Sequence, residues 1–231
     1  MDGTLLDAGG AGRWAMTRAF EEVFGIADAG PFSRIVRFDG MTDPGILRSI
    51  ARNAGIGDDR LQSSSAAIEE SFLRHLETRL DNTPARRVLP GVIDLLDRLA
   101  GVRMASVGLL TGNIEAGARL KLASVGLSSY FELGGFGGDA PDRAGIGISA
   151  RKRFEQQLDI SIDPADVVVI GDSTEDVRAG RINGYRTLAV GTGWTEHETI
   201  RAMEPDLLVA DLTDYAGVMQ FIFGTRGSAV T

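Results

Sequence analysis

The chain of 231 residues contains no cysteine and only two histidines, and aromatic residues make up just 6% of it. The lack of cysteine excludes disulfide bonds, thiol catalysis and cysteine metal sites, and it fits a reducing cytoplasm. No apolar run approaches the ~18 residues that a transmembrane helix needs. The first residues, MDGTLLDAGG, carry acids where a signal peptide would be basic. We therefore expect a cytoplasmic protein.

Basic residues are also scarce relative to acidic ones: 24 Lys and Arg face 32 Asp and Glu, which gives a net charge of −8. This balance argues against nucleic acid or an anionic membrane as the main partner. An acidic protein that handles phosphates needs a metal ion or a local basic group. With 43% hydrophobic and 24% charged residues, the chain is an ordinary globular sequence, which excludes disorder of the whole chain. The sequence does not indicate an oligomeric state.

The hydrophobic pattern divides the chain into two regions. Residues 11–85 are helical in pattern, with expected helices over 14–24, from Asp43 as N-cap with Pro44 following, and over 59–79. From Pro90 onwards short apolar runs alternate with helical patterns. The expected strands are 104–110, 130–136, 167–170, 186–190 and 207–209, and the expected helices between them include 92–99 and 148–158. This alternation predicts an α/β fold with a doubly wound, parallel, Rossmann-like sheet.

Polar motifs lie where strands of this sheet end, which is where such sheets bind ligands. They are Asp2-Gly3-Thr4, Thr111-Gly112-Asn113 and the segment GDSTED at 171–176. Each motif alone also has a purely structural explanation. Asp-Gly is a common turn, Thr111 or Asn113 suits a helix cap, and Ser173 with Asp176 has the spacing of a capping box.

Taken together, DGTLLD, LLTGN and VVVIGDSTED, in this order, resemble the haloacid dehalogenase superfamily, and more narrowly its phosphoglycolate phosphatase type. The segments VLPGVIDLLDRLA and GTGWTEHE add to the likeness. The resemblance implies an α/β core formed by residues 1–11 and 86–231 and an inserted helical cap over residues 12–85. It also implies Mg²⁺-dependent hydrolysis of a small phosphorylated metabolite through an aspartyl-phosphate intermediate.

The resemblance assigns roles to residues of the three motifs. Asp172 would bind Mg²⁺ directly and Asp176 would support the metal site, since magnesium prefers oxygen ligands. Asp2 would be the general acid and base, with its backbone carbonyl also on the metal. The phosphate would be bound by the Thr111 hydroxyl and by the backbone N–H groups of Gly112 and Asn113 at a helix N-terminus.

The third motif of the family carries a lysine that neutralises the phosphate, and this chain departs from that pattern. The corresponding stretch reads GGFGGDAPDRAG, in which Arg143 is the best candidate. Arginine keeps the charge and can grip two phosphate oxygens, so we expect Arg143 to take a catalytic, phosphate-binding role. Lys152 is the second choice, and a solvated loop position is the structural alternative for Arg143.

A second departure concerns the nucleophile. The family's first motif is a strand that ends in Asp-x-Asp-Gly-Thr, and its first aspartate forms the aspartyl-phosphate. Met1 occupies the x position here, so the nucleophile would be the residue before Met1. Asp2 does not replace it, because two residues of extended chain span ~7 Å. We expect Met1 to be an internal residue of a longer protein; the alternatives are a lost strand or another segment in its place.

The predicted cap contains one segment, FDGMTDP at 38–44, that resembles the part of related caps facing the active site. Thr42 and Asp43 either contact substrate or only cap a helix. Two other functions stay open. A β-phosphoglucomutase-like phosphomutase would use the same core, and an inactive phosphate-binding protein would explain the missing nucleophile. A 2-haloacid dehalogenase fits less well, because that branch uses no metal carboxylates.

Overall fold

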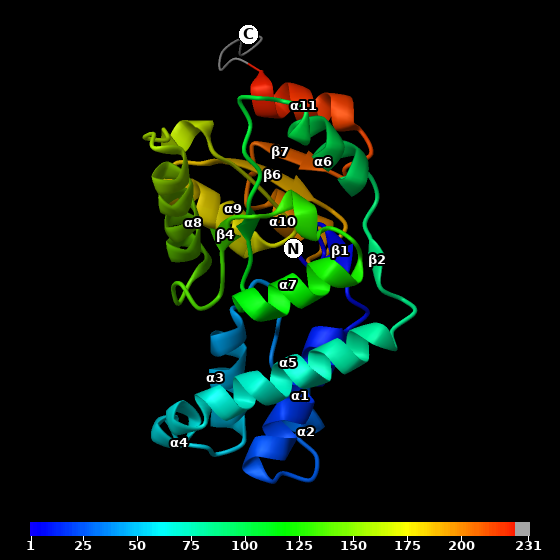
Figure 1. The fold of residues 1–231 in the computed structure, drawn as a ribbon, viewed down its shortest axis with the longest axis vertical. Coiled ribbons are helices and arrows are strands. Elements are labelled where there is room, and N and C mark those ends of the chain that lie inside the picture. The colour runs from blue at the N-terminus through cyan, green and yellow to red at the C-terminus, as the bar shows by residue number, and fades with distance from the viewer. Residues whose placement is uncertain (225–231) are drawn as a thin grey trace.

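The computed structural model describes residues 1–224 and places five helices together at one end of the molecule (Figure 1). These helices are α1 (Ala11–Phe24), α2 (Gly30–Arg34), α3 (Asp43–Asn53), α4 (Asp58–Ser63) and α5 (Ser65–Asp81). Helices α1 and α5 pack along each other, with Phe20 and Phe72 fully buried between the elements of this region. We call residues 12–85 the helical insertion; within the described chain this segment contains helices and no strand.

The chain enters and leaves the helical insertion through a pair of short strands. Strand β1 (Leu6–Asp7) precedes α1, and β2 (Arg87–Val88) follows α5. They pair antiparallel, with Leu6 opposite Val88, and Arg87 forms an ion pair with Asp7 at 3.0 Å. Both chain connections of the insertion therefore run through one strand pair.

The remaining residues form an α/β unit. Its elements are α6 (Val92–Ala100), β3 (Leu109–Leu110), α7 (Glu115–Ser124), β4 (Gly134–Gly135), α8 (Arg143–Leu158), β5 (Val168–Gly171), α9 (Thr174–Asn183), β6 (Arg186–Val190), α10 (His197–Arg201), β7 (Leu207–Val209) and α11 (Tyr215–Phe223), with 3₁₀ turns at Ser128–Tyr130 and Pro164–Asp166. Strands β3 and β4 pair in parallel, and β5, β6 and β7 form a second parallel group in that order. Within residues 1–224 the two groups do not pair with each other.

Two strands are shorter than the sequence predicts. The expected strand over 104–110 pairs only at Leu109–Leu110, and Met104 is 94% exposed. The expected strand over 130–136 pairs only at Gly134–Gly135, where a Cβ on Gly135 would lie 2.4 Å from the Ile146 carbonyl oxygen. Close packing of β4 against α8 therefore requires glycine here, and an apolar run alone did not show where pairing would stop.

Two helix assignments from the sequence were also wrong. The N-cap of α3 is Thr42, whose hydroxyl accepts from the Gly45 N–H at 3.2 Å, so Asp43 is the first helical residue. The expected single helix over 59–79 is interrupted at Ser64, between α4 and α5. The apolar spacing continues across this break, whereas serine side chains compete for backbone hydrogen bonds and favour helix ends.

Residues 1–224 contain no helix of the length and apolar character that crossing a bilayer would require.

Candidate active site

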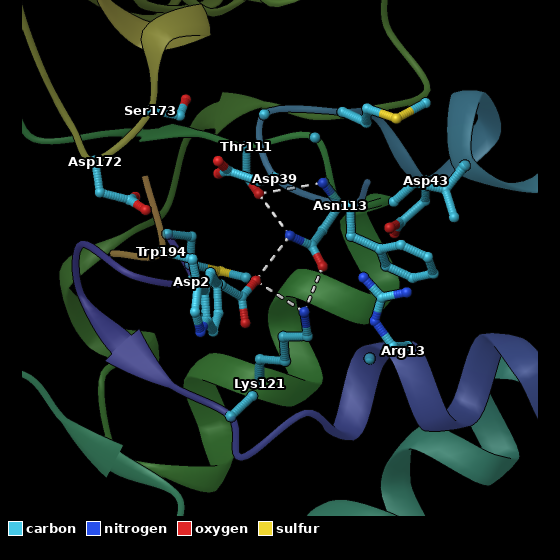
Figure 2. A pocket seen from close by; sticks show the side chains of 18 of the residues that line it. Asp2, Arg13, Asp39, Asp43, Thr111, Asn113, Lys121, Asp172, Ser173 and Trp194 are labelled. Atoms are coloured by element: carbon cyan, nitrogen blue, oxygen red, sulfur yellow. Dashed lines mark hydrogen bonds and ion pairs between the residues drawn. The ribbon is translucent and has the colours of Figure 1, made fainter. Parts of the chain in front are cut away.

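A cavity of about 610 Å³ lies between the α/β unit and the helical insertion (Figure 2). Its floor comes from residues that follow the parallel strands: Thr111 and Asn113 after β3, and Asp172 and Ser173 after β5. Asp2 lies among them, so the chain's first motif shares the cavity with the other two. The carboxyl ends of parallel strands meet at one edge of a sheet, which explains why segments distant in sequence converge here.

The most connected part of the cavity is a hydrogen-bonded group around Asn113. Its side-chain amide donates to Thr111 Oγ1 at 2.8 Å and to Asp2 Oδ2 at 3.1 Å. The Lys121 ammonium donates to Asn113 Oδ1 at 2.7 Å and to Asp2 Oδ2 at 2.8 Å. Thr111 also accepts from the Asn113 backbone N–H, which leaves the Thr111 hydroxyl proton available to donate into the cavity.

Lys121 is the residue of this site that sequence reasoning missed. It projects from the inner face of α7, where Gly117, Ala118 and Leu122 are also buried, and it is itself only 4% exposed. A lysine on the buried face of the helix that follows Thr111-Gly112-Asn113 was the available signal, because lysine is almost never fully buried without a partner. A Cβ on Gly12 would lie 3.1 Å from Lys121 Nζ, so α1 packs directly over this ammonium.

The ion pair sets the charge state of Asp2. Burial raises the pKa of Asp2, but the charge and hydrogen bond of Lys121, together with the Met1 amino group and the Asn113 hydrogen bond, outweigh burial, so the pKa lies below its ordinary value of 3.8. Asp2 is therefore ionised at neutral pH and accepts protons rather than donating them.

Asp172 occupies the other side of the cavity. The Thr4 hydroxyl donates to Asp172 Oδ1 at 2.6 Å, and a Cβ on Gly3 or Gly193 would lie 2.2 or 1.8 Å from Asp172 Oδ2. Both positions must be glycine for the carboxylate to lie where it does. Burial raises the pKa of Asp172 to about 6, although the nearby Met1 amino group acts in the opposite direction.

Asp176 and Arg143 form a separate pair at the edge of the cavity. Asp176 is the third helical residue of α9 and accepts from the hydroxyl and the backbone N–H of Ser173, in a capping box. Arg143, the first residue of α8, places Nε 3.2 Å from Asp176 Oδ1. Its Nε and Nη1 are buried and make no hydrogen bond within the described chain. Arg143 thus lines the cavity, but its charge faces Asp176, whereas Lys121 lies among the Thr111–Asn113 group.

The helical insertion contributes Thr42 and Asp43, which lie where the insertion contacts the loop that follows β3. The Asp43 N–H donates to the Gly112 carbonyl at 2.7 Å, and the Ile114 N–H donates to Asp43 Oδ2 at 2.9 Å. A Cβ on Gly112 would lie 2.1 Å from the Met41 carbonyl oxygen. Asp43 lines the cavity, and burial raises its pKa to about 6, against the lowering effect of Lys121. Thr42 is occupied as the cap of α3.

The donors present do not make a complete magnesium site. Asp172 offers one buried carboxylate, but Asp2 is engaged by Lys121 and Asp176 by Arg143. Within residues 1–224 no group of three or more His, Cys, Asp or Glu side chains could hold a metal ion. Magnesium prefers six oxygen ligands in a near-octahedral arrangement, and the side-chain carboxylates of residues 1–224 do not assemble such a set.

Comparisons with known proteins identify the family. A family model described as haloacid dehalogenase-like hydrolase matches residues 1–181, and one described as HAD-hydrolase-like matches residues 148–215. The chain belongs to the haloacid dehalogenase-like hydrolases. It is 31% identical over 170 residues to a phosphoglycolate phosphatase of Synechococcus elongatus, a match that covers 72% of each chain. A phosphoglycolate phosphatase 1 of Pseudomonas aeruginosa is 29% identical over 69% of this chain and 55% of its own length.

A solved structure supports the fold of this haloacid dehalogenase-like hydrolase. CbbY from Rhodobacter sphaeroides, crystallised in complex with phosphate, aligns with a TM-score of 0.68 at 17% identity and covers 93% of this chain and 92% of that chain. The expected α/β, Rossmann-like fold class is thereby confirmed, and so is the resemblance drawn from the three motifs. By family the chain is a phosphatase-type hydrolase.

Proposed function

We propose that the cavity binds the phosphoryl group of a small phosphate monoester and that the Thr111–Asn113–Lys121 group holds it for hydrolysis. The observation that carries the proposal is the convergence of a free hydroxyl proton on Thr111 and a buried Lys121 ammonium, both held in place by the Asn113 side-chain amide. Donors and a cation fixed in a partly dry cavity stabilise the negative charge of a phosphoryl group in transfer. The structurally similar CbbY was crystallised in complex with phosphate, which supports phosphate as the kind of group that the fold binds.

The substrate class follows from the relatives and the cavity. The two relatives described above, from Synechococcus elongatus and Pseudomonas aeruginosa, are phosphoglycolate phosphatases. A cavity of about 610 Å³ that is shared with the helical insertion accommodates a small metabolite. We therefore propose a short phosphate ester such as phosphoglycolate as the substrate.

The proposed reaction proceeds in two steps. A carboxylate attacks phosphorus, the bond from phosphorus to the leaving oxygen breaks, and the alkoxide takes a proton from water; a second water then attacks the aspartyl-phosphate, gives its proton to a base, and releases inorganic phosphate and the free carboxylate. Asp2 can accept that proton because it is ionised at neutral pH, although the interactions that lower its pKa make it a weaker base. By the resemblance to the family's first motif, the attacking carboxylate would stand directly before Met1.

The test measures phosphate release from phosphoglycolate and from 4-nitrophenyl phosphate, with Mg²⁺ present. We expect a version extended by a short strand that ends in Asp, directly before Met1, to be far faster than the chain as given. In the extended version Thr111→Val should lower kcat/KM roughly 10- to 100-fold, as expected for loss of a hydrogen bond to a charged group. Equal rates for the two chain lengths would show that another residue is the nucleophile.

A second candidate is a protein that binds phosphate without turning it over. It is favoured by one observation, namely that the described carboxylates do not assemble a group of three. Phosphate binding with no release of phosphate by either chain length would support it. A sugar phosphate returned as its isomer would instead indicate a phosphomutase.

A further inference from the structure

Four cationic side chains line the cavity, and only one of them has no carboxylate partner within residues 1–224. Lys121 pairs with Asp2 at 2.8 Å. The other two pairs are Arg143 with Asp176 at 3.2 Å and Arg37 with Asp39 at 3.3 Å. Arg13, the third residue of α1, makes no ion pair in the described chain. In a protein of net charge −8, an unpaired arginine at a cavity calls for an explanation.

The Arg13 guanidinium is held in place by neutral groups. Its Nη1 donates to the carbonyl oxygens of Ser33 and Val36, at 2.6 and 3.2 Å, and its central carbon lies 3.7 Å from the centre of the Phe38 ring. Figure 2 shows the Arg13 side chain extending from α1 beside the cavity, with Asp2 on the other side of the view. Burial lowers the pKa of Arg13, with no carboxylate to offset that cost. The orientation is therefore fixed before any ligand binds.

One edge of the guanidinium stays open. The two carbonyls occupy Nη1, whereas Nε and Nη2 make no hydrogen bond within residues 1–224. These two N–H groups point in parallel and match the two oxygens of a carboxylate in a bidentate pair. Recognition of a planar carboxylate is the chemistry that such an edge performs best.

Arg13 lines the same cavity as the proposed phosphate site. Gly12, the neighbour of Arg13 in α1, approaches Lys121 so closely that a Cβ on it would lie 3.1 Å from Nζ. One substrate that contacts both cations must therefore fit within this cavity of about 610 Å³, which favours a small molecule that carries a phosphate and a second anionic group.

We propose that Arg13 is a specificity-determining residue that binds a carboxylate on the leaving group of the substrate, within the same cavity. The proposal rests on the phosphate site proposed above and narrows its substrate to short phosphorylated carboxylic acids. Arg13 contacts the substrate's carboxylate and takes no part in proton transfer.

Calorimetric titration tests the proposal without requiring turnover. The ligands are phosphoglycolate, ethyl phosphate, in which a methyl group replaces the carboxylate, and ethanediol bisphosphate, in which a second phosphate replaces it. For the unaltered chain we expect phosphoglycolate to bind roughly 10- to 100-fold more tightly than ethyl phosphate, the range for a charge-assisted contact. We also expect it to bind more tightly than the bisphosphate.

The variants separate contact from charge. Arg13→Gln should abolish the preference for phosphoglycolate and leave the affinity for ethyl phosphate within about twofold. Arg13→Lys should keep part of the preference, because lysine keeps the positive charge but loses the two parallel N–H donors of arginine. Arg18→Gln removes an exposed arginine of the same helix and should change nothing. Thermal melting checks that each variant folds.

Four outcomes would overturn the proposal. A preference that survives in Arg13→Gln, or no preference in the unaltered chain, overturns the role of Arg13 alone. Tighter binding of the bisphosphate shows that the second group is a phosphate and overturns the carboxylate assignment. Failure of all three ligands to bind overturns the phosphate site and the Arg13 subsite with it.

Discussion

Removing the Lys121 ammonium gives the most searching test of how the site is held together. Lys121→Met keeps the length and much of the apolar stem but leaves Asp2 without its cation, and Asn113 Oδ1 without a donor. The side chains of Lys121 and Asp2 are only 6% and 20% exposed. Breaking a buried pair costs about 3–5 kcal/mol, and since Asp2 retains some contact with water we expect roughly 3 kcal/mol. For a chain of this size that is a fall in Tm of roughly 6–12 °C.

The pH dependence of this loss has a definite sign. In the unaltered chain the pKa of Asp2 is lowered, so its contribution to stability is present above the ordinary value of 3.8 and is lost as the pH falls through the lowered value. Without Lys121, burial is the leading influence and raises the pKa of Asp2, so the variant loses stability as the pH rises. The difference in free energy of unfolding should therefore be large at pH 7 and shrink towards pH 4.

Urea denaturation at several pH values measures these differences directly. Lys152→Met, at an exposed position of α8, is the matched control and should change stability little at any pH. In the double variant Asp2→Asn with Lys121→Met, most of the lost stability should return, since no buried charge is left unpaired. A constant difference between the unaltered chain and Lys121→Met from pH 4 to pH 7 would refute the reasoning.

Three further predictions concern other parts of the cavity. Burial raises the pKa of Asp43 to about 6, so ionisation of Asp43 lowers the stability of the folded state as the pH rises through that value. In urea denaturation, Asp43→Asn should therefore be more stable than the unaltered chain at pH 7, by at most about 3 kcal/mol, and should show no gain at pH 4. Gly112→Ala should lose roughly 1–3 kcal/mol in thermal melts, because its Cβ would lie 2.1 Å from the Met41 carbonyl oxygen, whereas Gly57→Ala, where a Cβ meets nothing within 4 Å, should not. Calorimetry should show only weak Mg²⁺ binding by the unaltered chain, and Asp172→Asn should weaken that Mg²⁺ binding further. Unchanged Mg²⁺ binding by Asp172→Asn would exclude Asp172 as a ligand.

Much of the fold follows from local pattern. Strands β5 and β6 form almost where the sequence predicts them, at the β-branched run 167–170 and at segment 186–190. The two strands pair with each other over four residues. Strands β3 and β4 were overestimated because hydrophobicity indicates burial, whereas strand pairing depends on which backbone lies alongside. The break at Ser64 was missed for a similar reason, since periodicity continues through it.

The sequence predicted the motifs of the candidate site, but it predicted the cationic residues of the site incompletely. One cavity is lined by Thr111, Asn113, Asp2 and Asp172. The sequence predicts this convergence, because the carboxyl ends of parallel strands meet at one edge of the sheet. The motif pattern does not indicate Lys121, because this lysine lies within α7 and not in the segment around Arg143, where the family's lysine is expected. A contact such as Lys121 to Asp2 joins residues 119 positions apart, and only the packing of α7 against the chain's first residues brings them together.

Binding of inorganic phosphate is the most direct test of the central claim, that the Thr111–Asn113–Lys121 group holds a phosphoryl group. Calorimetric titration of phosphate into the unaltered chain should show saturable binding to one site. Thr111→Val should weaken that binding by roughly tenfold or more, while Thr213→Val, an exposed position of the same chemistry, should leave it unchanged. Equal phosphate affinity in all three proteins, or no phosphate binding by the unaltered chain, would contradict the account.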